Sequence, residues 1–372
     1  YAELARRVLM RALLWLHRWT GGIVGILLAI IGLSGTVLLW EGSWIMLDGA
    51  HDPAVSDSVA MARAIEVARE TAPGLSRVTF AGDEIGLHQA VYSDGTGAYI
   101  AQDGTVVDRW SGMWERPELW LFDLHHYLLL GETGKTITGV LGILLLAFTI
   151  SGTILWWRTR KTFRFRLWPP RYTASAIVRH HRDLGVVASP LLIVAAATGT
   201  LMIFPAVSAF LLSPFGEAHQ KPALPTELAP VGPATDWQSV MRNAQGAFPS
   251  AAPRRLMLPS KPGEPIAIRF RQDFEWTPNR RSYVWIAPDS AAVVATDDPA
   301  NAGVVSAISE TFYPIHAAKV GGIVWRLAMT FAGLALVVLG LLASYSFWRG
   351  RIGKPAGRRR VAPRPGRAIG QP

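Results

Sequence analysis

The chain has 372 residues, of which half are apolar and only 17% are charged, a composition that excludes a single soluble domain. The absence of Cys excludes disulfides, thiolate metal sites, iron–sulfur clusters and covalently attached c-type haem, so any metal must be held by His or by carboxylates. The net charge of +10 does not predict nucleic-acid binding, because its distribution along the chain has a membrane explanation.

Four runs without a charged residue are long enough to cross a hydrocarbon core of about 30 Å, which predicts four transmembrane helices. They are Trp19 to Trp40, Ile137 to Trp157, Leu184 to Leu212 and Leu327 to Trp348. The first run is too long for a secretory signal and lacks its cleavage site, so we expect a retained helix. Pro190 and Pro205 in the third run indicate a kink or the outer end of that helix.

The positions of Lys and Arg predict the orientation of these helices. The N-terminus, the segment from Arg158 to Arg182 and the tail from Arg349 are basic, so we expect them on the cytoplasmic side of a bacterial inner membrane. Both termini are then cytoplasmic, and the two large loops are periplasmic. We interpret the basic tail as a topology signal that binds anionic membrane lipid, with no nucleic-acid partner.

Each large loop is predicted to form a small α+β module, with a helix followed by strands and a hairpin. The first has a helix at Ser58 to Thr71 and a hairpin at Ala98 to Val107, and the second has a helix at Asp236 to Ala247 and a hairpin at Tyr283 to Ala295. The fold class is therefore membrane α-helical with periplasmic α+β modules. The predicted order is the N-terminus with helix one (1–41), module one (42–123), helix two (124–158), the basic loop (159–182), helix three (183–213), module two (214–315), helix four (316–349) and the basic tail (350–372).

The two halves of the chain repeat one another, and the repeat organises the histidines. The equivalent positions, which keep their spacings without a gap, are His17 and His181, Gly35 and Gly199, His125 and His316, and Trp157 and Trp348. Both copies begin on the same side of the membrane, so we expect a pseudo-two-fold axis along the membrane normal.

Such an axis would bring His17 opposite His181 at the cytoplasmic level, and His125 opposite His316 at the periplasmic level. Two facing neutral imidazoles in an apolar bundle are the ligands of a bis-His b-type haem. We therefore predict two non-covalent b-type haems, whose iron is held by these four residues. No catalytic residue is predicted.

Neighbouring histidines leave the ligand choice open. His180 and His126 are alternatives to His181 and His125, or partners that orient the ligands, because a shift of one residue turns a side chain by about 100° around a helix. The other three histidines lie in the outer loops and receive no role: His51, His88 and His219.

Small residues follow His17 and His181 along one helical face. They are Gly21, Gly25, Gly32 and Gly35 in the first copy and Gly185, Ser189, Ala196 and Gly199 in the second. A flat macrocycle requires small neighbours, so the glycines are predicted to border the haems. Close packing of two membrane helices through small residues explains the same stripe without a cofactor.

With these residues placed, the sequence resembles the PepSY-associated transmembrane helix family. The stretches that carry the resemblance are His17 to Gly21, Ser34 to Thr36, Leu124 to His126, Ser151 to Thr153, His180 to Arg182 and the hairpin from Ala98 to Val107. The resemblance covers nearly the whole chain and is strongest for a stand-alone, iron-regulated branch. It implies two b haems and the reduction of ferric siderophores, such as ferrioxamine, in the periplasm of Gram-negative bacteria.

The leading functional hypothesis is a haem-dependent oxidoreductase that passes electrons across the inner membrane from an unknown cytoplasmic or membrane donor to a ferrioxamine-like ferric siderophore. The alternative is a membrane-anchored PepSY protein that regulates a periplasmic protease or binds a periplasmic ligand without redox activity. A siderophore transporter is disfavoured, because the spans hold almost no carboxylates for a substrate path.

Overall fold

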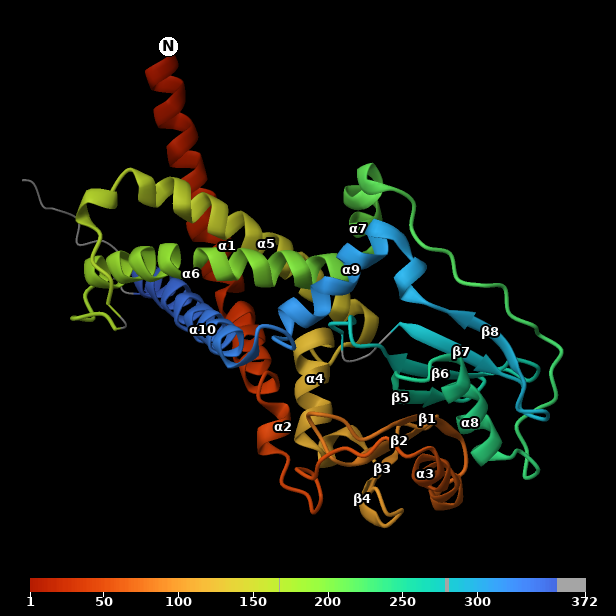
Figure 1. Ribbon diagram of the computed structural model, residues 1–372. Helices are drawn as coiled ribbons and strands as arrows, with labels where there is room; N and C mark the ends of the chain where they lie inside the picture. Colours follow the sequence, from red (N-terminus) through yellow and green to blue (C-terminus); the bar gives the residue numbers. More distant parts are fainter. Residues whose placement is uncertain (167, 278–280, 353–372) are drawn as a thin grey trace, which may run out of the picture.

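The computed structural model describes residues 1–166, 168–277 and 281–352 (Figure 1). Its helices are α1 (Ala2–Leu38), α2 (Glu41–Trp44), α3 (Ser58–Thr71), α4 (Pro117–Tyr127), α5 (Gly131–Trp157), α6 (Ala174–Ile203), α7 (Pro205–Leu212), α8 (Trp237–Ala247), α9 (Gly303–His316) and α10 (Gly322–Ile352). Its strands are β1 (Leu75–Thr79), β2 (His88–Tyr92), β3 (Gly97–Ile100), β4 (Val106–Trp110), β5 (Ala252–Met257), β6 (Ile266–Arg271), β7 (Ser282–Ile286) and β8 (Val293–Asp297). These elements form a helix bundle and a sheet domain.

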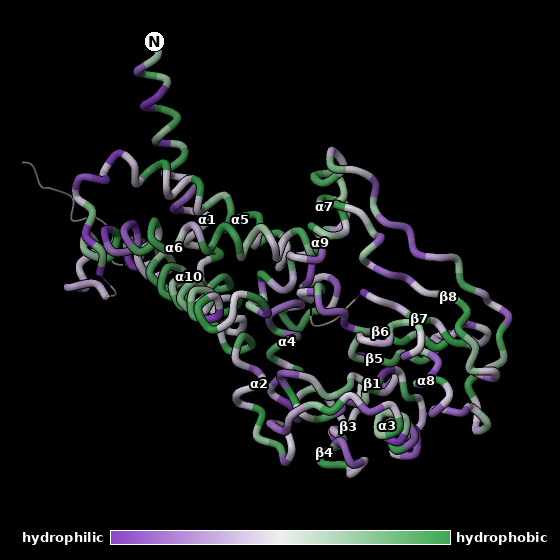
Figure 2. Tube along the Cα trace, in the orientation of Figure 1, coloured by the Kyte–Doolittle hydropathy of each residue, from purple (hydrophilic) through white to green (hydrophobic). Residues whose placement is uncertain are grey.

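Helices α1, α5, α6 and α10 are long and apolar enough to cross a membrane, which confirms the four predicted spans (Figure 2). Helix α1 begins at Ala2, well before the charge-free run that starts at Trp19. The residues in between are mostly Leu, Arg and Ala, which are strong helix formers, so the helix continues through the basic N-terminus.

Helices α1 and α10 pack against each other through glycines. A Cβ atom added at Gly25 would lie 2.6 Å from the Gly340 carbonyl oxygen, and one at Gly32 would lie 2.9 Å from that of Gly333. Such backbone contact is possible only where side chains are absent, and close approach is the main source of helix association in lipid. Gly25 and Gly32 thus allow α1 to pack closely on α10.

The outer ends of the second and fourth spans differ from the prediction. His125 and His126 lie on α4 and His316 lies on α9, which are separate short helices that precede α5 and α10. Leu128 and Leu129 have φ angles of 49° and 60° and end α4 in the left-handed region. Each histidine therefore approaches the bundle from a helix that can take its own direction.

Of the two prolines of the third span, only Pro205 divides it. Helix α6 runs through Pro190 and ends at Ile203. Pro205 begins α7, a short apolar helix, because its ring suits a first turn and cannot continue a preceding helix.

The two outer modules form one antiparallel sheet of eight strands in the order β4-β3-β2-β1-β5-β6-β7-β8 (Figure 1). Strand β1 pairs with β5, with Val78 opposite Leu256, which joins the modules at the centre of the sheet. The strand order reads the same outward from this junction in both directions. Two modules were expected, and their fusion into one sheet was not.

Helices α3 and α8 cover one face of the sheet and pack against each other, and the core lies between them and the strands (Figure 1). Ile65 of α3, Met241 of α8 and the strand residues Val78, Leu256 and Ile268 are fully buried there. Each such side chain stabilises the fold by about 1.5–3 kcal/mol. Helix α3 has the predicted bounds, and the Asp57 carboxylate accepts the Val59 N–H at its start.

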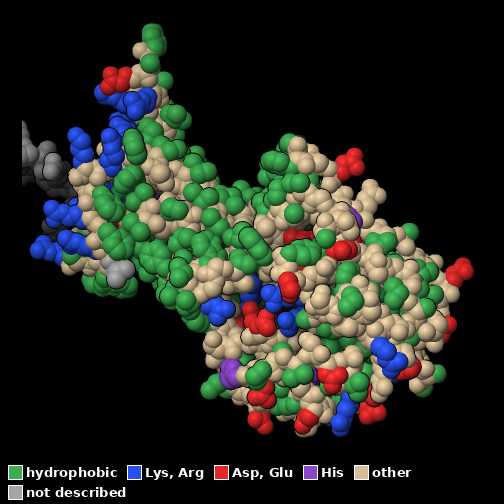
Figure 3. Space-filling model, in the orientation of Figure 1, with side chains coloured by type: hydrophobic (Ala, Val, Ile, Leu, Met, Phe, Trp, Pro, Cys, Tyr) green, Lys and Arg blue, Asp and Glu red, His purple; other side chains and the backbone are tan. Residues whose placement is uncertain are grey.

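Charged side chains are unevenly distributed over the molecule. Figure 3 shows Lys and Arg gathered at the end of the bundle farthest from the sheet domain, whereas Asp and Glu are spread over the sheet domain. This division agrees with the sequence, in which the N-terminus and the segment from Arg158 to Arg182 are basic.

Candidate functional site

The first pair of histidines joins two spans near the basic end of the bundle. His17 of α1 and His181 of α6 have ring centres 6.3 Å apart, with the rings nearly perpendicular at 83°. The neighbouring His180 is also buried but forms no ring contact with His17 among the described residues. The open choice between His180 and His181 is thus resolved in favour of His181 as the residue that faces His17.

The second pair lies at the end of the bundle nearest the sheet domain. His125 of α4 and His316 of α9 have ring centres 6.2 Å apart. His126 packs against Phe122 and Tyr127, with ring centres 5.5 and 4.6 Å away, and also lines the cavity beside the pair. The structure therefore brings together the pairs that the repeat predicted, and it places His125 rather than His126 opposite His316.

The spacing of both pairs suits two ligands on opposite sides of one metal ion. A histidine nitrogen binds a transition metal at about 2.0–2.1 Å, and with about 1.1 Å from each nitrogen to its ring centre two opposed ligands place their centres about 6.3 Å apart. Within the described residues no group of three or more His, Asp or Glu gathers to hold a metal ion. Two facing imidazoles fit a metal whose other ligands come from a macrocycle.

Hydrogen bonds orient three of the four rings and leave their Nε2 atoms available. Nδ1 of His125 lies 3.0 Å from the Ile31 carbonyl, and Nδ1 of His316 lies 3.0 Å from the Ala195 carbonyl. A carbonyl only accepts, so each Nδ1 carries the proton and each Nε2 presents a lone pair. His17 Nδ1 lies 2.8 Å from Ser151 Oγ. The Ser151 hydroxyl donates its own proton to the Ala147 carbonyl, so its oxygen accepts from Nδ1. These contacts fix the tautomer that binds a metal through Nε2.

Glycines shape the second pair. A Cβ added at Gly35 would lie 2.6 Å from Cε1 of His125, and one at Gly199 would lie 3.0 Å from Cε1 of His316. Both glycines also line a mainly apolar cavity of about 330 Å³ beside the two rings. The residues fit a flat apolar cofactor at this end.

The other predicted glycines have mixed surroundings. Gly32 lines the same cavity and also packs on α10, while Gly25 packs on α10 alone. A Cβ added at Gly185 would lie 3.7 Å from the Leu339 side chain, and one at Gly21 would meet no atom within 4 Å. Helix packing thus accounts for Gly25, and the role of Gly21 beside a cofactor stays a prediction.

The two pairs lie at opposite levels of the bundle. Gly35, which touches the His125 ring, follows His17 by 18 residues of one helix, a rise of about 27 Å. Gly199 touches the His316 ring and follows His181 by the same number of residues. Because a hydrocarbon core is about 30 Å thick, the pairs would lie near its two faces.

The rim of the cavity holds ionisable groups that the sequence did not single out. Glu41 and Lys319 line it beside the second pair, and burial raises the pKa of Glu41 to about 7 against the lowering effect of Lys319. Tyr313 lies one turn before His316 on α9 and lines the same cavity. Tyr313 and Lys319 each lie three residues from His316 in the sequence, but only the fold shows that they line the cavity.

The outer-loop histidines have structural surroundings. His88 is buried in β2 and accepts the Ala81 N–H at Nδ1, and burial lowers its pKa to about 4. His219 Nε2 lies 2.7 Å from a carboxylate oxygen of Asp297. His51 is exposed.

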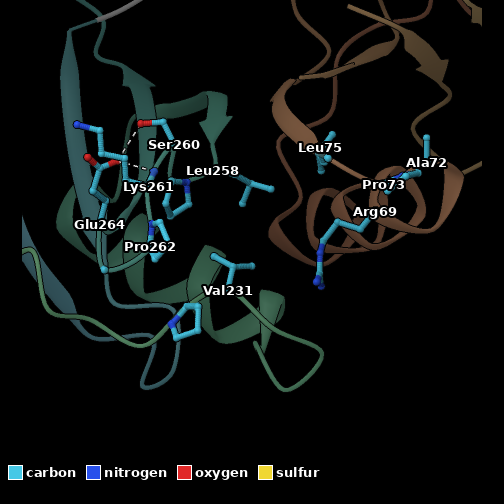
Figure 4. Close-up of a pocket in the computed structure, with 14 residues that line it drawn as sticks. Arg69, Ala72, Pro73, Leu75, Val231, Leu258, Ser260, Lys261, Pro262 and Glu264 are labelled. Atoms are coloured by element: carbon cyan, nitrogen blue, oxygen red, sulfur yellow. Dashed lines mark hydrogen bonds between the residues drawn. The ribbon is translucent and has the colours of Figure 1, made fainter. Parts of the chain in front are cut away.

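A separate cavity of about 440 Å³ lies where the modules join (Figure 4). Two of its charged groups are engaged within the fold: Arg69 lies over the Trp237 ring, and the Glu264 carboxylate accepts from the Ser260 hydroxyl and the Lys261 N–H. It contributes nothing to the histidine pairs.

Residues 14–351 match the family described as PepSY-associated TM region, and the chain belongs to this family. It is accordingly a membrane protein of the PepSY-associated transmembrane class. A comparison with proteins of curated function returns no match. The finer resemblance to the stand-alone branch that reduces ferric siderophores stays a prediction.

Proposed function

We propose that the protein is a di-haem b oxidoreductase of the bacterial inner membrane that delivers electrons to ferric siderophore iron in the periplasm. The observation that carries this proposal is the presence of two histidine pairs, each with the ring separation of opposed metal ligands and each at one level of the bundle. His17 and His181 would hold one haem, and His125 and His316 would hold the other. When bound, each haem supplies reversible one-electron chemistry that no side chain of this chain offers.

The chain's own residues prepare both positions. Ser151, Ile31 and Ala195 accept from Nδ1 and hold the rings in the tautomer that presents Nε2. The apolar lining of the cavity excludes water from the second pair, with side chains such as Leu141, Leu192 and Leu336. A neutral ligand set of this kind adds no charge to the hydrocarbon.

The position of the pairs also supports transfer across the membrane. The basic end of the bundle is the cytoplasmic side in our proposal, which places the sheet domain in the periplasm. One electron per iron would enter at the His17 level from an unknown cytoplasmic or membrane donor and leave at the His316 level. Siderophores hold ferric iron more firmly than ferrous iron, so reduction would release it.

The alternative, a PepSY protein that anchors a periplasmic regulator, gives no reason for two ring pairs at 6.3 and 6.2 Å. It predicts a colourless protein. The proposed function predicts two low-spin b haems per chain in the purified protein, measured by visible spectra before and after dithionite and by a pyridine haemochrome assay.

Variants connect the spectrum to the residues. His17→Ala and His316→Ala should each reduce the haem content from two per chain to one, because each removes one ligand of a different pair. His51→Ala replaces an exposed loop histidine and should keep both haems. Full haem content in both ligand variants, or a colourless wild-type protein expressed with added haem, would refute the proposal.

A further inference from the structure

A cavity of about 470 Å³ separates the uncovered face of the sheet from α9. The residues that matter for its chemistry are Lys221, Arg269, Arg281, Tyr283, Glu310 and Tyr313. They come from the connector after α7, strands β6 and β7, the residue just before β7, and one face of α9. The cavity is therefore assembled by the fold rather than by a local motif.

Its acidic groups are already engaged. Asp297 lies 2.7 Å from His219 Nε2, and Glu310 lies 3.7 Å from Arg281. Lys221, by contrast, forms no ion pair with a carboxylate in the part of the chain that the structure describes. Its Nζ lies over the Tyr283 ring at 4.8 Å. This contact holds the ammonium group in place without neutralising it.

Further positive charge lies on the same face of the sheet. One row of facing residues crosses strands β1, β5, β6 and β7 and consists of Thr79, Arg255, Arg269 and Tyr283. Burial lowers the pKa of Arg255 to about 10, and the positive charges of Arg77 and Arg269 lower it further in the same direction. Because these arginines are partly buried and repel one another, they create a positive electrostatic potential that attracts anions.

The cavity adjoins the second histidine pair. Tyr313 lines both this cavity and the cavity beside His125 and His316. On α9, Ser306, Glu310 and Tyr313 lie on one face, and His316 follows Tyr313 by a rise of about 4.5 Å. A molecule held among the basic residues would thus lie next to the turn of helix that carries His316.

We propose that this cavity binds an anionic iron(III) chelate, whose carboxylate oxygens face Lys221 and Arg269 and share Arg281 with Glu310. The inference rests on the proposed function and deepens it by naming the substrate class. It departs from the ferrioxamine-like substrate expected from the sequence, since ferrioxamine carries a cationic amine that these residues repel.

Binding is tested with gallium(III) chelates, which have the charge of the iron(III) complexes but are not reduced under these conditions. Isothermal titration calorimetry on the purified full-length protein compares gallium(III) citrate, citrate alone and gallium(III) ferrioxamine B at two salt concentrations. Lys221→Gln and Arg281→Gln remove one positive charge each from the cavity. Lys261→Gln makes the same change at the separate cavity of Figure 4 and is the matched control.

We expect the gallium citrate complex to bind more tightly than gallium ferrioxamine B and more tightly than citrate alone. Each cavity variant should weaken it by about tenfold, the loss typical of one charge-assisted contact, and Lys261→Gln should leave it unchanged. Added salt should weaken it as well. Tighter binding of the cationic chelate, equal binding of metal-free citrate, or wild-type affinity in both cavity variants would overturn the inference.

The haem content of the same preparations separates this inference from the proposed function. Two haems with no binding of the anionic chelate would leave the electron-transfer proposal intact and overturn the substrate class. Selective binding of the anionic chelate by a protein without haem would support the cavity and refute the redox role.

Discussion

The contact between Gly35 and His125 makes the second pair sensitive to a single methyl group. In Gly35→Ala, the new Cβ would lie 2.6 Å from Cε1 and 3.1 Å from Nδ1 of the ring. Carbon atoms prefer about 3.5–4.0 Å, so the ring must retreat by about 1 Å. That movement also strains the hydrogen bond from Nδ1 to the Ile31 carbonyl, which orients the ring.

A metal–nitrogen bond of about 2.0 Å cannot stretch by such an amount. Loss of the contacts that orient a ligand typically lowers metal affinity by about 10–100-fold. We therefore expect Gly35→Ala to lose haem from the His125 and His316 pair and to retain it at the other pair. The haem content should fall from two per chain toward one.

Gly152→Ala is the matched control. It also replaces a glycine inside a helix, but its Cβ would lie 3.5 Å from Cε1 of His17, an ordinary van der Waals contact. Both substitutions improve helix propensity by roughly 1 kcal/mol, so helix stability does not distinguish them. Pyridine haemochrome assays and redox titrations of both variants provide the comparison. Two haems with unchanged potentials in Gly35→Ala would show that the ring contact does not define a ligand site.

Two further predictions concern other histidines. His181→Gln should remove the haem of the first pair, whereas His180→Gln should keep both haems, and the same assay decides; the reverse result would reassign the ligand. His88 accepts the Ala81 N–H, and burial lowers its pKa from 6.5 to about 4. Between these pH values the unfolded chain therefore binds a proton at His88 that the folded domain does not bind. The free energy of unfolding of the sheet domain should fall by about 3 kcal/mol as the pH falls from 6.5 to about 4. Thermal denaturation should show that loss in the wild type and a smaller one in His88→Gln; equal acid sensitivity would contradict it.

The sequence predicted those features that depend on spacing along one helix or on repetition. The four spans, the equivalence of His17 with His181 and that of His125 with His316 follow from runs and offsets that are visible in the chain. The choice between His180 and His181 was beyond such reasoning, because it depends on how far α6 is rotated against α1.

Other features depend on backbone conformation or on pairing between distant segments. Leucine rarely adopts a positive φ, so nothing in the sequence marks Leu128 and Leu129 as the end of α4. The row of Arg255 and Arg269 requires the register of the strands, which residue spacing alone does not determine. The same holds for the pairing of β1 with β5.

The mirror-like strand order around the β1 and β5 junction bears on the ancestry of the chain. Two identical halves assembled about a two-fold axis would pair β1 with its own copy and would generate this order, together with facing copies of each histidine. The protein thus has the form of a homodimer whose two subunits became joined in one chain. Either half produced alone would expose the edge that the other now covers, so we expect such halves to dimerise or to aggregate.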